Sequence, residues 1–288
     1  MTHKGVCKMK TIYYETIVKE VKRLCQEANY ALPQDVYQAL KKAYETEDSL
    51  LSKQTLEVLN KNAKIAKETC SPICQDTGMA CIFVEIGQDV HVEGSLKEAI
   101  FEGVRQGYQE GYLRKSVVDD PMFDRINTKD NTPAIINYDI VEGDQLKIIV
   151  APKGFGSENM SQVKMLKPSD GVQGVKDFVM KVVNDAGPNA CPPMVIGVGI
   201  GGSFDRVTLL AKKAMLREIG THHPDQRYHD LEDELLEKIN QTGIGPAGYG
   251  GRTTALSLNI ETYPTHIAGM PVAVSICCHV ARHKEVIL

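Results

Sequence analysis

Apolar side chains recur at helical spacing through the first 70 residues of the chain. Ile17, Val21, Leu24 and Ala28 follow one another at steps of three and four residues, which predicts an amphipathic helix. The Leu32-Pro33 pair ends this helix, and a second helix is expected over residues 34–44. A looser pattern of the same period predicts a third helix, whose apolar face would be formed by Leu51, Thr55, Leu59, Asn62 and Ala66. We therefore expect residues 1–70 to be entirely helical.

The hydrophobic period changes to two in the middle of the chain. Residues 81–86 form a short apolar run that ends at Gly87, which predicts a strand. Apolar and polar residues alternate over residues 134–140 and again over 146–150, on either side of the turn at 142–144. This arrangement predicts an antiparallel hairpin.

Helix and strand signals continue to the end of the chain. Ser95 and Glu98 form a capping-box pattern that predicts a helix start, and we expect this helix to close at Arg114. The other predicted helices cover residues 172–183, 207–218 and 225–239, and the other predicted strands cover 194–198, 254–262 and 271–276. No internal repeat, low-complexity tract or linker interrupts this order. The prediction is a mixed α/β fold, a single helix-and-sheet domain over residues 1–288 with a helical part at 1–70.

The composition narrows the class of protein. Hydrophobic residues make up 42% and charged residues 24% of the 288 residues, which is ordinary globular composition. The net charge of −4 and the absence of Trp argue against a nucleic-acid partner. No apolar stretch approaches the roughly 20 residues of a membrane helix, and the first residues lack the apolar core of a secretory signal. We expect a soluble cytoplasmic protein without a membrane partner, whose eight cysteines are thiols.

Three glycine-rich segments lie between the predicted elements, at residues 154–159, 197–202 and 243–251. Glycine lets backbone amides approach a ligand closely, so three such segments favour a polar ligand. The segment 197–202 also satisfies the dinucleotide-binding pattern G-x-G-x-x-G, which would make the protein a nucleotide-binding enzyme. However, the acidic residue at the right distance, Glu218, falls at the end of the following predicted helix, so close strand-to-helix packing is the better interpretation.

Three cysteines occupy loops or element ends. Cys74, Cys191 and Cys278 are flanked by Pro, Gly or polar residues, whereas Cys25 lies on a helix face and Cys81 inside a strand. Three loop thiolates suit an iron–sulfur cluster with one iron left open. Their long spacing and the absence of a C-x-x-C pair leave space-filling thiols as the alternative.

Two further residues allow a structural and a functional interpretation. Arg114 either complements a helix dipole or clamps a substrate carboxylate through its planar guanidinium. His266 precedes the last predicted strand, where it is a hydrogen-bonded structural histidine or a catalytic one.

Several motifs together resemble one known family, the alpha subunit of class I fumarate hydratase, which belongs with L-tartrate dehydratase to the iron–sulfur hydro-lyases. The motifs that carry the resemblance are PICQDTG at 72–78, GFGSENMS at 154–161, NACPP at 189–193 with GVGIGG at 197–202, THIAGMPVAV at 265–274 and CHVARH at 278–283. The similarity runs from about Glu15 to Leu288. It implies an oxygen-sensitive [4Fe-4S] cluster held by Cys74, Cys191 and Cys278, with Cys278 preferred over Cys277 because it directly precedes His279.

The same resemblance implies roles for the surrounding residues. Gln75, Asp76 and Arg114 would contact the dicarboxylate, His266 would lie near it, and Asp76 and His266 are the catalytic candidates. The loop that would line the site contributes Gly154, Gly156, Ser157 and Asn159. The chemistry agrees, because hydrating a C=C bond requires a Lewis acid, a group that moves a proton and cations that hold the dianion. An alternative places the acid–base residue on another subunit.

The resemblance also implies a partner and a substrate. Single-chain members continue into a second domain, so we expect a separate beta subunit and a catalytically incomplete lone chain. The 156–161 loop resembles the fumarase form, which favours fumarate hydration to malate over L-tartrate dehydration. The rival from another class is a non-catalytic iron–sulfur or zinc sensor module, which would explain the cysteines but neither Arg114 nor the glycine-rich loops.

Overall fold

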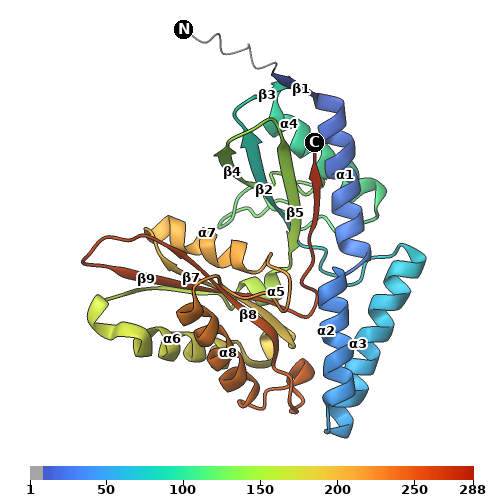
Figure 1. The fold of residues 1–288 in the computed structure, drawn as a ribbon. Coiled ribbons are helices and arrows are strands. Elements are labelled where there is room, and N and C mark those ends of the chain that lie inside the picture. Colours follow the sequence, from blue (N-terminus) through green and yellow to red (C-terminus); the bar gives the residue numbers. More distant parts are fainter. Residues whose placement is uncertain (1–8) are drawn as a thin grey trace. The chain divides into compact units, whose positions relative to one another are not determined.

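The computed structural model describes residues 9–288, and Cys7 lies outside them. The described chain mixes helices and strands, which confirms the predicted fold class. It forms two compact units that alternate along the sequence (Figure 1). We call residues 9–32, 65–154 and 282–288 unit 1, and residues 33–64 and 155–281 unit 2.

Two packed helices form one layer of unit 1. They are α1 (Tyr14–Tyr30) and α4 (Leu96–Glu110), and α1 buries the predicted stripe of Ile17, Val21, Leu24 and Ala28. Gly103 and Gly107 of α4 let the two backbones approach, because a Cβ at either position would lie less than 3.0 Å from Val21 or Cys25. One short strand precedes each helix: β1 (Lys10–Tyr13) precedes α1 and β3 (Val90–Glu93) precedes α4, and the two strands pair in parallel. Because β1 lies within the first 70 residues, this segment is not entirely helical, contrary to the prediction.

The main sheet of unit 1 has the strand order β10-β5-β2-β4, formed by β10 (Lys284–Ile287), β5 (Leu146–Lys153), β2 (Met79–Gly87) and β4 (Ile135–Val141). The predicted hairpin is wrong, because β2 lies between β4 and β5 and pairs with both. The continuous apolar run of β2 is buried and needs a neighbour on each side, whereas β4 is half-exposed and serves as an edge. The turn between β4 and β5 instead packs against residues 87–89 at the end of β2. The backbone amides of these three residues donate to the carbonyls of Gln145, Val141 and Gly143.

Unit 2 includes α2 (Gln34–Thr46) and residues 50–64 of α3 (Leu50–Thr69). The predicted apolar face of α3 is confirmed at Ala66, which is buried, but in unit 2 other residues of the helix are buried. Ser52, Leu56 and Ala63 are buried, whereas Leu51 is 52% exposed. Ser52 is buried because its hydroxyl donates to the carbonyl of Gly250 at 2.6 Å, a polar contact that a hydrophobic pattern does not reveal.

The sheet of unit 2 has the order β6-β9-β7-β8. Its strands are β6 (Gln162–Leu166), β9 (Met270–Cys277), β7 (Met194–Gly201) and β8 (Ala255–Tyr263). One face packs on α6 (Gly171–Ala186) and α8 (Gln226–Asn240), and α7 (Phe204–Ala214) covers the other (Figure 1). The short elements of this unit are α5 (Phe155–Glu158), η1 (Pro168–Asp170), η2 (Gly187–Ala190) and η3 (Pro246–Gly248).

The glycine pattern at 197–202 serves helix packing. Gly197 and Gly199 lie inside β7 rather than in a phosphate-binding turn, and added Cβ atoms would stand 2.0 and 2.2 Å from the carbonyls of Ala211 and Val207. These glycines therefore let α7 lie directly on the sheet, which confirms the packing interpretation. Across residues 9–288, no helix combines the length and the apolar character that crossing a membrane requires.

Candidate active site

The loop that carries Cys74, Gln75 and Asp76 joins α3 to β2 and lies in unit 1. The thiol of Cys74 is 3.3 Å from the side-chain oxygen of Gln75. Asp76 accepts the amide of Gly78 through Oδ1 at 3.0 Å. Gly78 has φ +76°, and the backbone of Lys153 lies 2.7–2.8 Å from the point where a Cβ would stand. The loop therefore turns at a position that only glycine fits.

Buried polar side chains fix the far end of this loop. The hydroxyl of Tyr108, which is fully buried in α4, lies 2.9 Å from the carbonyls of both Thr77 and Gly78. Burial raises the pKa of Tyr108, so its hydroxyl keeps its proton and donates. Asn131, also buried, donates to the carbonyl of Gly78 at 3.2 Å and accepts the amide of Ser116 at 2.8 Å. Residues from two other segments therefore hold the loop in one conformation.

Arg114 lies beside the same loop but does not end a helix. α4 ends at Glu110 and Gly111 caps it, so the predicted helix end at Arg114 is wrong. The amide of Arg114 donates to Thr77 Oγ1 at 2.9 Å, and that hydroxyl donates back to the carbonyl of Arg114 at 3.1 Å. The backbone is thus fixed while the side chain is exposed. Since Arg114 lies outside the last turn of α4, the interpretation as a helix-dipole partner loses its basis.

Two residues border the carboxylate and backbone of Asp76. A Cβ on Gly154 would stand 3.1 Å from Asp76 Oδ2, so glycine leaves room for that oxygen. Arg282, only 6% exposed, donates from Nη2 to the carbonyl of Asp76 at 2.6 Å. Its Nε and Nη1 atoms are buried without a hydrogen-bond partner among the described residues. Buried donors in this state fit an anionic ligand, since leaving them unpaired is costly.

The sequence prediction did not assign a role to Arg282. It belongs to the motif at 278–283, and its position four residues after Cys278 was the available signal. Only the fold brings it next to Asp76, 206 residues earlier in the chain.

Cys191 and Cys278 both lie in unit 2. Cys191 follows η2 in a left-handed backbone conformation with φ 53°, before a cis bond between Pro192 and Pro193. Its carbonyl accepts the amide of His279 at 3.3 Å and lies 3.0 Å from that histidine's Nδ1. The two predicted ligands are thus brought together through the residue that follows Cys278. Cys278 is half-buried and Cys277 is buried in β9, which agrees with the preference for Cys278.

The predicted substrate loop continues into unit 2 as one helical turn. Gly156 and Ser157 lie in α5, and Asn159 follows it. Ser157 is buried, whereas Gly156 and Asn159 are exposed. α5 lies against η2, which leads to Cys191, and against β9, which ends next to Cys278. Unit 2 therefore contains residues 155–159 of this loop together with both cysteines, while Gly154 belongs to unit 1.

His266 lies apart from these cysteines. It belongs to the turn before β9, whereas Cys278 follows the other end of that strand. At the usual rise of a strand, the seven steps from Met270 to Cys277 span ~23 Å. His266 Nδ1 accepts the amide of Ala268 at 3.2 Å, so the proton of the neutral imidazole is on Nε2, and the side chain is exposed.

The cysteines differ in their capacity to bind a metal. Burial raises the pKa of the Cys25 thiol to about 12, which keeps it protonated at neutral pH. Cys81 is also buried, whereas Cys74 and Cys278 are half-buried and Cys191 and Cys70 are exposed. The three predicted ligands are therefore accessible loop thiols, a donor set that fits a cluster with three cysteine ligands.

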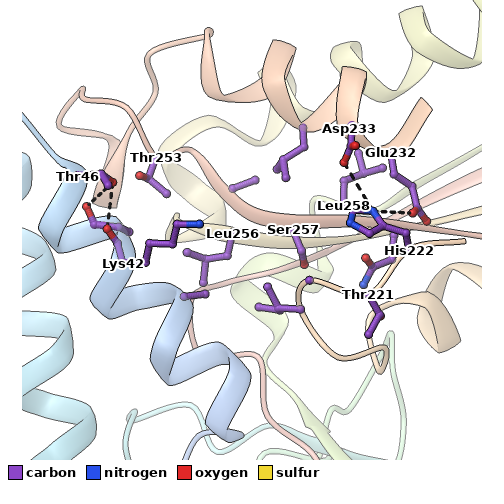
Figure 2. Close-up of a pocket in the computed structure, with 17 residues that line it drawn as sticks. Lys42, Thr46, Thr221, His222, Glu232, Asp233, Thr253, Leu256, Ser257 and Leu258 are labelled. Carbon is purple, nitrogen blue, oxygen red and sulfur yellow. Dashed lines mark hydrogen bonds and ion pairs between the residues drawn. The ribbon is translucent and has the colours of Figure 1, made fainter. Parts of the chain in front are cut away.

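A separate pocket of about 320 Å³ opens in unit 2 between α2, α8 and β8 (Figure 2). Its polar lining residues include Lys42 and Thr46 near one end and His222, Glu232 and Asp233 near the other. None of the sequence-predicted site residues lines it. The glycine-rich segment at 243–251 does not line it either. That segment instead ends against the buried carboxylate of Glu47: a Cβ on Gly251 would stand 2.7 Å from Glu47 Oε2, and this oxygen accepts the amide of the next residue, Arg252, at 2.9 Å.

The sequence model of the fumarate hydratase (fumerase) family matches residues 18–287 of the chain. A Methanocaldococcus jannaschii protein provisionally named L(+)-tartrate dehydratase subunit alpha is 46% identical over 267 residues, which cover 91% of this chain and 94% of that protein. The L(+)-tartrate dehydratase subunit alpha of Escherichia coli K12 is 33% identical over 261 residues, covering 89% of this chain and 86% of its own length.

Proposed function

Because the chain belongs to the fumarate hydratase (fumerase) family, we propose that it is the alpha subunit of an iron–sulfur hydro-lyase that reversibly hydrates fumarate to malate. The observation that carries the proposal is the assembly in unit 1, where Cys74, Gln75 and Asp76 share one loop with Arg114 and Gly154 beside it. The thiol would hold the cluster that supplies the Lewis acid, the carboxylate would move a proton and the guanidinium would bind a substrate carboxylate.

Cys74, Cys191 and Cys278 are the proposed cluster ligands. When bound, a [4Fe-4S] cluster with three cysteine ligands supplies an open iron that acts as a Lewis acid toward a hydroxyl group and a carboxylate. The rest of the reaction falls to the protein. Asp76 is proposed to move the proton on the neighbouring carbon, since its Oδ2 faces the space that Gly154 leaves. Arg114 is proposed to bind a substrate carboxylate with its exposed guanidinium.

Arg282 contacts the same site through its hydrogen bond to the carbonyl of Asp76. Its two donor atoms without partners among the described residues fit the sulfide of a cluster or the carboxylate of a substrate. Gln75, which is exposed beside Cys74, is proposed as a polar contact to the dicarboxylate. The α5 segment with Gly156 and Ser157, followed by Asn159, is proposed to line the site next to Cys191 and Cys278.

His266 is too far along the chain fold from Cys278 to be placed at the same site in the same way as the other residues. The resemblance makes it a catalytic candidate, but β9 separates it from Cys278 within unit 2. We therefore propose that His266 serves the reaction site of a second copy of the chain rather than its own, through the exposed Nε2–H group.

A beta subunit is the proposed partner. Both relatives described above are named as alpha subunits, which supports a second chain here. Apolar side chains on α3 also support an interface, because Leu50, Leu51 and Val58 are 74%, 52% and 64% exposed. The expected behaviour is full turnover only when both subunits are present.

The test of the ligands is iron analysis after anaerobic cluster reconstitution. Cys74→Ser, Cys191→Ser and Cys278→Ser should each lose the stable cluster and its brown colour. Cys25→Ser and Cys81→Ser are the matched controls and should keep their iron. Cys277→Ser against Cys278→Ser identifies the ligand in the adjacent pair. Equal iron loss in all variants would reject the assignment, and a colourless protein with bound zinc would favour a sensor module.

The test of the activity is anaerobic co-expression with a candidate beta subunit, followed by assays with fumarate and L-tartrate. Faster turnover of fumarate supports the proposal. Preferential dehydration of L-tartrate would favour the second candidate, which the names of the relatives support. Full fumarate turnover by the 288-residue chain alone would show that no beta subunit is needed.

A further inference from the structure

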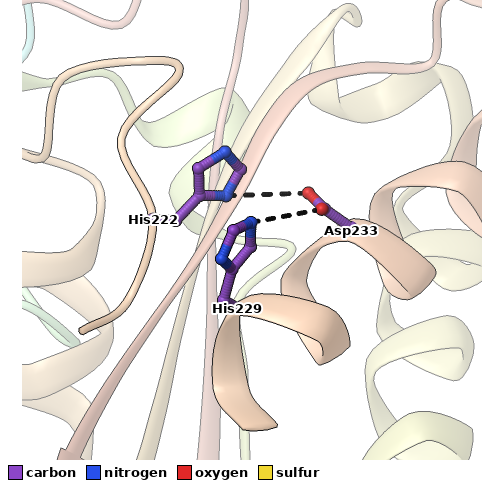
Figure 3. A group of neighbouring side chains, drawn as sticks. All are labelled: His222, His229 and Asp233. Carbon is purple, nitrogen blue, oxygen red and sulfur yellow. Dashed lines mark ion pairs between the residues drawn. The ribbon is translucent and has the colours of Figure 1, made fainter. Parts of the chain in front are cut away.

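Two histidines and an aspartate meet at the start of α8 in unit 2 (Figure 3). His222 lies in the turn that leads to the helix, and His229 and Asp233 lie four residues apart on the helix itself. His229 Nε2 is 3.4 Å from Asp233 Oδ2, and His222 Nδ1 is 3.6 Å from Asp233 Oδ1. The three possible ligand atoms all lie within 4.8 Å of one another.

This geometry is close to that of a metal site. Ligand atoms around a tetrahedral Zn²⁺, with bonds of roughly 2.0–2.2 Å, lie about 3.3–3.6 Å apart. The two imidazole rings stack with centroids 3.8 Å apart and an angle of 25° between them. Neutral imidazoles are the forms that bind metal. We propose that His222, His229 and Asp233 bind one divalent cation of the zinc type, separately from the cysteine ligands.

The surrounding residues hold the site in place without a metal. Asp225 caps α8 by accepting the amide of Arg227 at 3.0 Å, and its own amide donates to His223 Nδ1 at 3.0 Å. The buried carboxylate of Glu232 accepts the amide of His223 at 3.0 Å and pairs with Arg217 at 2.9 Å. The turn next to His222 is therefore tied to α8 on both sides. Because the turn is already ordered, binding a cation should cost little conformational entropy.

The negative charge of Glu232 favours a cation over an anion at this site. Its Oε2 lies 3.9 Å from His222 Nδ1 and adds negative charge behind the histidine, which favours a cation. Its oxygens already accept the amides of His223 and Ile260, so it is not counted as a ligand. Three protein ligands leave a fourth coordination position, and His222 and Asp233 line the pocket of Figure 2, into which that position can open.

The outer nitrogen of His229 faces the side chain of Gln226. Metal-bound histidines usually donate their other N–H group to an oxygen acceptor. The side-chain nitrogen of Gln226 lies 3.3 Å from His229 Nδ1 and also donates to Asp230 Oδ1 at 2.7 Å, so metal binding would require Gln226 to leave Asp230 before its oxygen could accept that N–H group. The alternative is a metal-free cluster in which the histidines only form ion pairs with Asp233.

Zinc binding to the full-length chain separates the two alternatives. The chain is reconstituted anaerobically with iron and sulfide, so that cluster cysteines are occupied, and is then titrated with Zn²⁺ by calorimetry. We expect the wild type to bind one equivalent of Zn²⁺ per chain in addition to the iron of the cluster. The control His91→Ala, which removes an exposed histidine of unit 1, should bind the same amount. His229→Ala and Asp233→Asn should each weaken binding at least tenfold, while circular dichroism and hydro-lyase activity stay unchanged.

Two further measurements keep the result unambiguous. Co²⁺ bound in place of Zn²⁺ should lack the intense thiolate charge-transfer absorption, which would otherwise indicate cysteine ligands. His222→Ala changes the turn rather than the helix, so it serves if His229→Ala misfolds. Absence of a Zn²⁺ equivalent in the wild type, or equal affinity in the wild type and in the folded variants, would overturn the proposal. Loss of activity without a change in zinc affinity would concern the proposed hydro-lyase and not this site.

Discussion

The two cysteine-bearing regions are held in place by different means. In unit 1, side chains from other segments fix the loop after Cys74: Tyr108 and Asn131 bind its carbonyls, and Thr77 exchanges hydrogen bonds with the backbone of Arg114. In unit 2, backbone contacts predominate around Cys191: its carbonyl accepts the amide of His279 and its amide donates to the carbonyl of Pro188, while the imidazole of His279 adds one side-chain contact to the Cys191 carbonyl. Loss of a side chain far from the proposed ligand should therefore loosen the first loop more than the second.

Because of this difference, substitutions in the two regions should have different effects on cluster binding, catalysis and loop stability. Backbone contacts survive most substitutions, so changes near Cys191 should act mainly through lost ligands. The unit 1 loop combines a ligand with the groups proposed to bind and protonate substrate, and its anchors are buried side chains. Substitutions there should separate cluster binding, catalysis and loop stability from one another.

The largest effect is expected for Asp76→Asn. The amide keeps an oxygen that accepts the amide of Gly78, so the loop should stay folded. It cannot transfer a proton to the substrate carbon, so kcat for hydration should fall by about 10²–10⁴ while iron content is unchanged. Asp144→Asn, which alters an exposed carboxylate in the turn after β4, is the control. Steady-state fumarate hydration under anaerobic conditions measures both, and wild-type activity in Asp76→Asn would remove Asp76 from the mechanism.

His266→Asn tests whether His266 of one copy of the chain acts at the site that contains Asp76 of another copy. The asparagine oxygen can replace Nδ1 as acceptor for Ala268, but the outer N–H group is lost. We expect kcat to fall by about 10² with the fold unchanged. Co-expression of His266→Asn and Asp76→Asn chains should then restore part of the activity, because a mixed assembly contains one site with both intact residues. Unrestored activity would contradict the assignment of His266 to a second copy.

Arg114→Lys keeps the charge but removes the planar guanidinium. The backbone contacts with Thr77 do not depend on the side chain, so stability and iron content should not change. We expect kcat/KM to fall about tenfold or more, which corresponds to about 1.4 kcal/mol of transition-state binding. Arg125→Lys is the control at another exposed arginine of unit 1. Equal kcat/KM in both variants would show that Arg114 does not contact the substrate.

Amphipathic periodicity predicted the helices of the N-terminal segment well. The stripe on α1 and the Ser95 cap of α4 are confirmed, the latter by a contact of 3.3 Å from Ser95 Oγ to the amide of Glu98. Local patterns could not reveal that β2 would enter between β4 and β5, because sheet order depends on contacts between distant segments. The face of α3 was misplaced for a similar reason, since buried Ser52 is paired by a carbonyl from residue 250.

The site was predictable to the extent that its residues lie in recognisable motifs. The motif at 72–78 identified the loop of Cys74, Gln75 and Asp76, but the contact of Arg282 with Asp76 spans 206 residues and has no local signature. The strand predicted at 271–276 already lies between His266 and Cys278, and β9 confirms that a full strand separates them. The spacing of His229 and Asp233 puts both on one helix face, but His222 reaches them only because the preceding turn folds back.

The smallest effect on activity is expected for Tyr108→Phe, and it tests the side-chain anchoring directly. The ring keeps its packing, but the carbonyls of Thr77 and Gly78 lose the hydroxyl that lies 2.9 Å from each. Since these contacts are buried, the free energy of unfolding should fall by about 1–3 kcal/mol, measured by urea denaturation. Tyr138→Phe, on the half-exposed edge strand β4, should change it by less than about 0.5 kcal/mol. The loosened loop should lower kcat only a few-fold and release iron faster in air. An unfolding free energy equal to that of the control would show that the loop does not depend on this side chain, and the contrast between the two cysteine regions would then rest on Asn131 and Thr77 alone.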